Sequence, residues 1–368
     1  MKRKCLTLEV GLGRRSYRIE IAPGVLEKIG RIAADLGLGT KCAIVSDETV
    51  FDIYGSEVRQ SLESAGFEPA PIVLPPGEST KSMAFLEQIY DRMIEHRLDR
   101  KSFIVALGGG VVGDIAGFAA ATYMRGIPFM QAPTTLLAQV DSSVGGKVAV
   151  NLPQGKNLIG AFYQPAAVVI DPRVLKTLDQ REMKAGFVEV AKHGMIKDPA
   201  FFDFMDENAE NILACDLPTL SHAIHTSCKI KSEVVEQDER ESGLRAILNF
   251  GHTAGHALEM LTGYSRYLHG EAVAVGMVAA IEISDRYFHR ETDPKGRIVG
   301  LLKACDLPTA MPDLPPQDIL QAMIMDKKNI EGKLKMVLLR EIGTVEIVDD
   351  LSQKLVIEAL EKLQQESP

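Results

Sequence analysis

The stretch FIVALGGGVVGDIAGFAA, residues 103–120, joins a continuous apolar run to a cluster of glycines and then to small and apolar residues. An apolar run that ends in glycines is typical of a buried strand that turns directly into a helix. Gly108, Gly110 and Gly113 have the spacing G-x-G-x-x-G. Glycines at these positions let the main chain approach a pyrophosphate, and the helix N-terminus supplies N–H donors. One interpretation of the stretch is a strand-turn-helix unit whose glycine loop holds the phosphates of a nucleotide.

The nucleotide interpretation has a competing one. The acidic residue that usually follows the glycines by about 20 positions is missing, and glycine-rich turns also serve plain packing of a helix on a strand. Asp47, at the end of CAIVSD, could take the ribose hydroxyls or could cap a helix that begins with ETVFDIY. Thr134 and Thr135 have the same two interpretations, a helix cap or a hydroxyl donor to a ligand.

Short apolar runs alternate with helical stretches up to about residue 178. LTLEV and YRIEIA alternate like a hairpin, CAIVSD and PFMQAP are typical of buried strands, and residues 83–96 have helical periodicity. Alternation of this kind predicts a Rossmann-like α/β domain with a parallel sheet, over residues 1–178.

Helical periodicity dominates the rest of the chain. It runs through residues 181–197, 217–237, 249–261 and 271–286, and only LKMVLLREIGTVEIV near the end reads as a hairpin. These patterns predict a mainly helical second domain over residues 179–368, with a ligand cleft between the two domains.

Composition narrows the class of protein. The chain has 368 residues, 46% of them hydrophobic, which is enough for two cores. A net charge of -9 argues against a nucleic-acid partner. The five cysteines form no CxxC pair, and no apolar run is long enough to span a bilayer. We expect a cytoplasmic protein without a membrane partner.

FGHTAGHALE, residues 250–259, places His252 and His256 on one face of a helix. His269 follows His252 by 17 positions, and AGFVEVAKHG offers Glu189 on another helix. Two histidines and one glutamate leave a position of a zinc ion open to water or substrate, as catalytic sites do. Spacing alone leaves it open whether His256 is a ligand or a base.

Several cations stand on glycine-rich loops or among apolar residues, in contrast to the acidic total. They are Lys147, Lys156, Lys192, Lys231 and Arg245. A group of this kind suits a small anion that carries phosphate or carboxylate.

Long ordered motifs over nearly the whole chain resemble the 3-dehydroquinate synthases of the shikimate pathway, a family of sugar-phosphate cyclases. They are ALGGGVVGDIAGFAAATYMRGIPFMQAPTTLLAQVDSSVGGKVAVNLPQGKNLIGAFYQP, AGFVEVAKHG, DERESGLRAILNFGHTAGHALE, YLHGEAVAVGM and DKKNIEGKLKMVLL. The resemblance implies NAD, a divalent metal (usually zinc, with cobalt as an alternative) and a homodimer. The implied reaction converts 3-deoxy-D-arabino-heptulosonate 7-phosphate to 3-dehydroquinate and phosphate, through transient oxidation, phosphate elimination, re-reduction and aldol closure.

The resemblance also assigns residues. It implies Glu189, His252 and His269 as metal ligands and His256 as a polar active-site residue. The implied cofactor positions are Asp47, Glu78, Lys81, Gly110, Val111, Val112, Gly113, Asp114, Thr134, Thr135, Asp141, Lys147, Lys156 and Thr177. The implied substrate positions are Lys147, Lys156, Asn157, Lys192, Lys231, Arg245, Asn249, His256 and Lys328 or its neighbour Lys327, with Arg125 inserted from the partner subunit.

Two other activities share parts of this pattern. One is a different NAD- and metal-dependent sugar-phosphate cyclase, and the other is a metal-dependent polyol dehydrogenase of the glycerol-dehydrogenase type. Arg245 and Asn249 favour a substrate with a carboxylate, because a guanidinium is suited to that group. A catalytically inactive binding protein is disfavoured because every implied site position is filled.

Overall fold

The computed structural model describes residues 5–289, 294–325 and 334–366. Its contacts group the chain into two compact units. The first contains Met1–Leu178 and Leu217–Arg240, and the second contains Asp179–Asp216 and Glu241–Pro368. None of the helices among the described residues is both long and apolar enough to cross a membrane.

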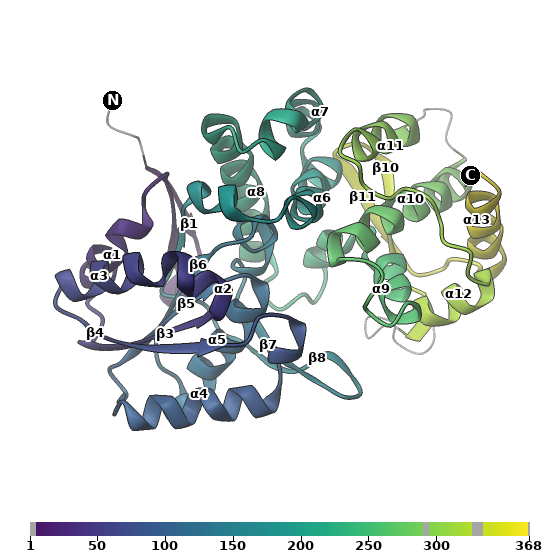
Figure 1. Ribbon diagram of the computed structural model, residues 1–368. Helices are drawn as coiled ribbons and strands as arrows, with labels where there is room; N and C mark the ends of the chain where they lie inside the picture. The colour runs from purple at the N-terminus through teal and green to yellow at the C-terminus, as the bar shows by residue number, and fades with distance from the viewer. Residues whose placement is uncertain (1–4, 290–293, 326–333, 367–368) are drawn as a thin grey trace. The chain divides into compact units, whose positions relative to one another are not determined.

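The first unit contains a seven-stranded sheet in the order β1-β2-β9-β6-β5-β3-β4 (Figure 1). Its strands are β1 Leu6–Val10, β2 Tyr17–Ile21, β3 Lys41–Asp47, β4 Glu68–Leu74, β5 Phe103–Gly108, β6 Phe129–Pro133 and β9 Ala167–Ile170. β1 and β2 form an antiparallel hairpin, and every other pair in the sheet is parallel. The predicted hairpin and parallel sheet are therefore confirmed.

Helices cover both faces of the sheet, and its central strands are therefore buried. All residues of β5 and β6 are buried, as in parallel sheets that carry helices on either side. The helices of this unit are α1 Ile29–Asp35, α2 Glu48–Val50, α3 Ser56–Ser64, α4 Met83–Glu95, α5 Gly110–Thr122 and α8 Leu217–Gln237. A separate antiparallel ribbon consists of β7 Lys147–Leu152 and β8 Gly155–Phe162.

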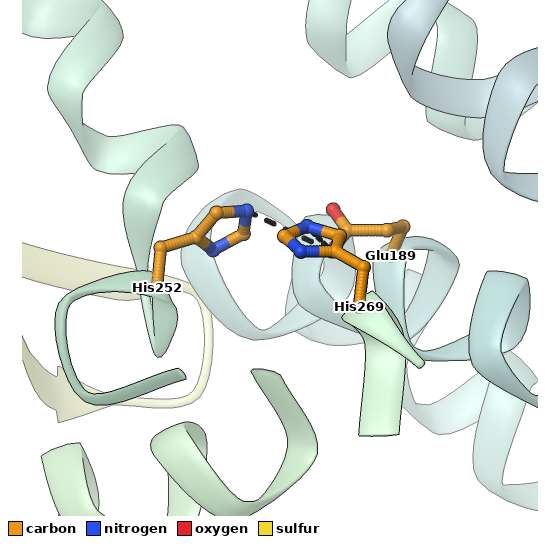
Figure 2. Close-up of side chains that lie close together, drawn as sticks. All are labelled: Glu189, His252 and His269. Atoms are coloured by element: carbon orange, nitrogen blue, oxygen red, sulfur yellow. Dashed lines mark ion pairs between the residues drawn. The ribbon is translucent and has the colours of Figure 1, made fainter. Parts of the chain in front are cut away.

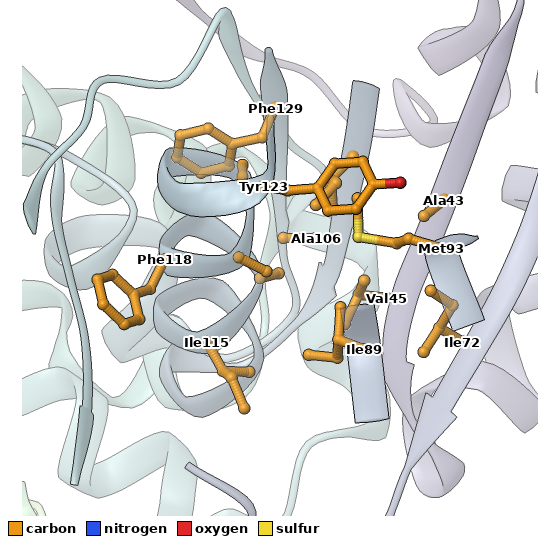
Figure 3. Close-up of a cluster of buried hydrophobic side chains, with 14 of the residues drawn as sticks. Ala43, Val45, Ile72, Ile89, Met93, Ala106, Ile115, Phe118, Tyr123 and Phe129 are labelled. Carbon is orange, nitrogen blue, oxygen red and sulfur yellow. The ribbon is translucent and has the colours of Figure 1, made fainter. Parts of the chain in front are cut away.

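Buried hydrophobic side chains from the sheet and from α4 and α5 form one core cluster (Figure 3). Val45 and Ala106 from the sheet pack with Ile89 and Ile115 from α4 and α5. A Cβ at Gly117 would lie 2.4 Å from Val148 in β7, so the close approach of helix and ribbon excludes any larger residue.

Helix α8 packs on the first unit, although its position in the sequence is within the helical half. Glu236 accepts a hydrogen bond from the Gly11 amide at 2.6 Å, and Glu239 pairs with Arg15 at 2.6 Å. Helical periodicity predicts that this segment belongs with residues 179–368. The difference has a simple reason, because helical periodicity shows which face is apolar but not which element covers it.

The second unit is mainly helical. Its helices are α6 Gln180–Lys197, α7 Pro199–Leu213, α9 His252–Leu261, α10 His269–Phe288, α11 Pro294–Ala304, α12 Pro316–Met325 and α13 Gln353–Gln365. β10 Met336–Glu341 and β11 Thr344–Val348 form the predicted hairpin. Residues Ala272–Ser284 of α10 are all buried, and α10 contacts α6, α9, α11, α13 and β10. The central position of α10 makes it the main support of this unit.

A buried carboxylate ties α10 to two other helices. Glu282 is 1% exposed and receives hydrogen bonds from Lys295 at 2.7 Å and from Lys362 at 2.9 Å. Burial raises the pKa of Glu282, but the two lysines outweigh it and the pKa is lowered. The charged form of Glu282 is therefore stabilised by folding.

Glu282→Gln is expected to lower the free energy of unfolding at pH 7 by about 2 kcal/mol, because the lysines lose their buried partner. Since folding depresses the Glu282 pKa, its contribution is complete above about pH 4.5 and is lost as the pH falls through the folded value. Urea unfolding at several pH values measures the effect, with the exposed Glu361→Gln as the charge-matched control. A difference that does not shrink at acid pH would contradict the assignment.

Candidate active site

The glycine-rich turn lies where the strand order of the sheet reverses. β3 is followed by β4 on one side, whereas β5 is followed by β6 on the other, and β3 pairs with β5. Ligands of open α/β sheets bind beside the carboxyl ends of the strands at such a switch point. Asp47 ends β3 and Gly108 ends β5, so both predicted cofactor residues lie at this position.

The glycines of the turn provide space rather than unusual backbone angles. None of Gly108, Gly109, Gly110 and Gly113 is among the described residues with positive φ. A Cβ at Gly113 would lie 2.8 Å from Gln131 in β6, and one at Gly110 would lie 3.1 Å from Ser142. Gly113 therefore serves packing of α5 on the sheet, which was the competing interpretation, while the same turn leaves the first amides of α5 without a side-chain cap.

Thr134 supplies a polar atom that fits a cofactor. The residue is 6% exposed, and among the described residues its Oγ1 has no hydrogen-bond partner. Buried hydroxyls are normally paired, so an unpaired one beside the end of β6 suits a ligand with polar atoms. The Thr134 hydroxyl and the uncapped amides of α5 together suit a dinucleotide bound at the carboxyl ends of the strands.

Asp47 and Thr135 both act as helix caps. Asp47 accepts a hydrogen bond from the Val50 amide at 3.0 Å, and Thr135 accepts one from the Ala138 amide at 3.1 Å. The capping interpretation is therefore confirmed for both residues. A carboxylate has a second oxygen, so the cap on Asp47 is compatible with a ligand at the same residue.

Charged pairs surround the turn. Lys81 is 5% exposed and binds Asp114 in the first turns of α5, and Lys231 from α8 binds Asp141 at 2.5 Å. Burial raises the pKa of Asp114, and Lys81 opposes this shift. The ion pair between Lys231 and Asp141 helps to attach α8 to the first unit.

The other predicted residues of the first unit lie on its loops and on the ribbon. Lys147 begins β7, and Lys156 and Asn157 lie at the start of β8. Thr177 receives or donates a hydrogen bond at 2.8 Å with Tyr54. Glu78 accepts a hydrogen bond from Asn151 at 2.7 Å.

Glu189, His252 and His269 converge in the second unit (Figure 2). The Nε2 atoms of His252 and His269 lie 3.8 and 3.9 Å from Oε1 of Glu189, and one ligand atom from each residue lies within 4.8 Å of the others. Among the described residues, this buried Oε1 accepts no hydrogen bond. A buried oxygen facing two imidazole nitrogens is a donor set that fits a divalent ion such as zinc.

The opposite nitrogens of both imidazoles are already engaged. Nδ1 of His252 lies 3.1 Å from the Phe250 carbonyl, and Nδ1 of His269 lies 3.2 Å from Glu259. Such contacts fix the tautomer of metal-binding histidines. Burial lowers the pKa of His269, but the hydrogen bond and charge of Glu259, with the charge of Glu189, outweigh it and raise the pKa.

Glycine contacts bring the three helices together. A Cβ at Gly270 would lie 2.0 Å from the Ala185 carbonyl, and one at Gly276 would lie 2.0 Å from the Gly251 carbonyl. The first contact joins α10 to α6, which carries Glu189, and the second joins α10 to the start of α9, which carries His252. Gly251 and Gly255 admit α10 in the same way, because a Cβ at Gly251 would lie 2.9 Å from the Val273 carbonyl and one at Gly255 would lie 3.1 Å from the Ala272 carbonyl.

Gly270→Ala is expected to lower the free energy of unfolding by about 3 kcal/mol, because the added Cβ must displace main chain. The shift separates His269 from Glu189, so affinity for added divalent ions should also fall. Gly300→Ala in α11 is the matched control, because nothing lies within 4 Å of its Cβ. It should raise stability by about 0.5 kcal/mol, and denaturant unfolding of both variants measures the contrast. Equal stability of both variants would contradict the close contact.

Two other predicted residues of the second unit, His256 and Lys192, lie near this group. His256 is 5.4 Å from His252 and 5.8 Å from His269 between ring centroids, and Lys192 pairs with Glu189. Arg245 is buried, and Asn249 donates to Glu241 at 2.7 Å. Lys327 and Lys328 lie outside the described residues.

Glu259 was not singled out from the sequence. It follows His256 by three positions and therefore lies on the same face of α9, which was the available signal. Its partner, His269, is on a different helix, and only folding brings the two residues together.

Comparison with solved structures gives the class of this fold. The chain matches 2-epi-5-epi-valiolone synthase of Streptomyces hygroscopicus subsp. jinggangensis, solved with NAD+ and Zn2+, at a TM-score of 0.87, 28% identity and 95% and 97% coverage of the two chains. It also matches 2-deoxy-scyllo-inosose synthase, complexed with carbaglucose-6-phosphate, NAD+ and Co2+. The TM-score is 0.86 and the identity is 27%, and the match covers 97% of this chain and 100% of that chain. Fold and site thus define the class of α/β-plus-helical synthases to which both structures belong.

Sequence comparison gives the family. The 3-dehydroquinate synthase N-terminal model matches residues 71–185, and the C-terminal model matches residues 186–329. A 3-dehydroquinate synthase of Desulforamulus reducens is 51% identical over 355 residues, 96% of this chain and 99% of that protein. The chain belongs to the 3-dehydroquinate synthase family, as its motifs predicted.

Proposed function

We propose that the protein converts 3-deoxy-D-arabino-heptulosonate 7-phosphate to 3-dehydroquinate and phosphate. The observation that supports this most is the unpaired buried Oε1 of Glu189, which faces the Nε2 atoms of His252 and His269. A family member with this donor set has the means to bind the divalent ion that the reaction requires.

Two groups of residues hold the cofactors in this proposal. Glu189, His252 and His269 bind a divalent ion, zinc or cobalt, while the α5 turn, Asp47 and Thr134 bind NAD. A bound nicotinamide supplies a reversible hydride acceptor, and the ion supplies a Lewis acid for the substrate hydroxyls. Lys192 donates a hydrogen bond to the second oxygen of Glu189, which leaves Oε1 as the oxygen available to the ion.

The cations hold the substrate. The residues proposed to hold the substrate, which are these cations and three polar residues, are Lys147, Lys156, Lys192, Lys231, Arg245, Asn157, Asn249 and His256. Charge-assisted hydrogen bonds are about twice as strong as neutral ones, so they retain a doubly anionic substrate through several steps. A planar guanidinium at Arg245 is suited to the carboxylate, and His256, beside the metal group, is suited to proton transfer.

A phosphate-release assay tests the proposal directly. Purified protein with the heptulosonate phosphate, NAD and Zn2+ should release one phosphate per turnover without net NADH at 340 nm. Removal of the ion with a chelator should stop release, and added Zn2+ or Co2+ should restore it. No phosphate release under these conditions would reject the proposal.

Another cyclase activity is the second candidate, favoured by the likeness to 2-deoxy-scyllo-inosose synthase. Glucose 6-phosphate lacks the carboxylate, so phosphate release from it alone would indicate that activity. Net NADH formation from glycerol would instead indicate a polyol dehydrogenase.

We further propose that the protein is a cytoplasmic homodimer in which Arg125 reaches the active site of the partner subunit. Arg125 is exposed, and among the described residues it makes no hydrogen bond or ion pair. Its φ of +70° follows a φ of +50° at Met124, a backbone conformation that costs energy in residues other than glycine. Such strain at an exposed arginine supports a functional position.

A further inference from the structure

The carboxylate of Glu259 lies behind His269, on the side away from Glu189. Its Oε2 is 3.2 Å from Nδ1 of His269, whereas Nε2 of the same ring is 3.9 Å from Oε1 of Glu189. The imidazole therefore stands between two carboxylates and presents a different nitrogen to each (Figure 2 shows the side toward Glu189).

Burial of Glu259 makes its contact with Nδ1 of His269 energetically important. Glu259 is 5% exposed, and a buried charged group is unfavourable unless it is paired. A neutral imidazole has one N–H, and the nitrogen next to a carboxylate carries it. Glu259 therefore places the proton of His269 on Nδ1 and the lone pair on Nε2.

His252 also has a hydrogen-bond acceptor beside Nδ1, but that acceptor is a main-chain carbonyl. Its Nδ1 lies 3.1 Å from the Phe250 carbonyl, and its Nε2 lies 3.8 Å from Glu189. No substitution removes a carbonyl, whereas the partner of His269 is a side chain that can be changed. We propose that Glu259 is a positioning residue, which holds His269 with Nδ1 protonated and Nε2 directed at the ion beside Glu189.

A different role for Glu259 is geometrically available. Ligand atoms of His256, Glu259 and His269 also lie within 4.8 Å of one another, so Glu259 could bind an ion directly. The hydrogen bonding of the carboxylates favours the group Glu189, His252 and His269 as the ion site. Among the described residues, Glu189 Oε1 accepts no hydrogen bond, whereas Glu259 Oε2 already contacts Nδ1 of His269. An ion completes the pairing at Glu189, and Glu259 remains behind the ring.

The inference rests on the proposed metal site, and Co2+ binding to the metal-free protein tests it. We expect a dissociation constant about 10- to 100-fold higher for Glu259→Ala than for wild type, measured by chelator competition. Glu259→Gln should lose less affinity, because its amide oxygen still accepts from Nδ1–H although the charge is gone. Glu361→Gln, an exposed change in the same unit, should bind as wild type.

Two spectroscopic readings separate positioning from ligation. The visible absorption bands of bound Co2+ should keep their wild-type form in both variants, because the three ligands are unchanged. Nitrogen-15 NMR of the metal-free protein should show the Nδ1–H tautomer of His269 in wild type and Glu259→Gln, and a mixture of tautomers in Glu259→Ala.

The possible outcomes are distinct. Wild-type affinity in Glu259→Ala overturns the inference; if that variant does not fold, wild-type affinity in Glu259→Gln does so. Equal losses in both variants with an altered Co2+ spectrum also overturn it, because Glu259 is then a ligand. Absence of Co2+ binding in the wild type instead removes the proposed metal site itself.

Discussion

His252→Ala is expected to abolish tight binding of the divalent ion and to reduce phosphate release to background. His252 is proposed to contribute one of three ligand atoms, and its Nε2 lies 3.8 Å from Glu189 Oε1. Loss of a direct ligand should weaken binding by more than the roughly 10- to 100-fold that follows loss of a residue behind a ligand. The Gly255 amide donates to the Gly251 carbonyl at 3.0 Å, so the start of α9 does not depend on the His252 side chain and the helix should remain.

Metal content after dialysis and phosphate release measure this effect together. His96→Ala, at an exposed histidine of the first unit, is the control and should match wild type in both assays. His256→Ala separates the two helical histidines, since it should bind the ion as wild type but lose activity. A zinc-loaded and active His252→Ala protein would contradict the proposed ligand set.

Arg245→Ala is expected to lower kcat/KM for the heptulosonate phosphate by at least about 100-fold, or about 3 kcal/mol of transition-state stabilisation. The side chain is 2% exposed, so water competes little for the hydrogen bonds that Arg245 is proposed to make with a substrate carboxylate. Lys156→Ala should cause a loss of the same order, because Lys156 is proposed to hold the same substrate.

Steady-state kinetics with saturating NAD and Zn2+ measure both losses. Arg245→Lys keeps the charge but not the planar fork, so its activity should lie between those of the wild type and Arg245→Ala. Metal content should be unchanged in all three variants, which distinguishes a lost substrate contact from a damaged metal group. Kinetics like those of wild type in Arg245→Ala and Lys156→Ala would refute the substrate assignments.

Local sequence patterns predicted most of the elements. The hairpin at the N-terminus, the buried strands and the helices at 83–96 and 181–197 follow from periods of 2 and 3.6 and from apolar runs. The helix expected from residue 249 begins at His252, because Leu244–Asn249 forms a tighter turn and Gly251 takes a left-handed conformation before the helix. Boundaries depend on such single residues, whereas periodicity averages over many.

The site was predictable only where the chain brings residues together locally. His252 and His256 share a face because they are four positions apart. Attachment of α8 to the first unit, and with it the position of Lys231, depends on partners in β1 and in the short helix Ala138–Ser142, which contains Asp141. These partners lie far away in sequence, so helical periodicity alone could not reveal them.

Taken by itself, the order of residues determined which groups are available: a strand that turns through glycines into a helix, histidines at helical spacing, and long motifs shared with one enzyme family. Tertiary structure alone decided that Glu189 and His269 face the same point, that Glu259 stands behind His269, and that Gly270 sets the distance between their helices. The physical reason is that hydrogen bonding and steric exclusion act through space over a few ångströms, whereas sequence patterns report only neighbours along one helix or strand.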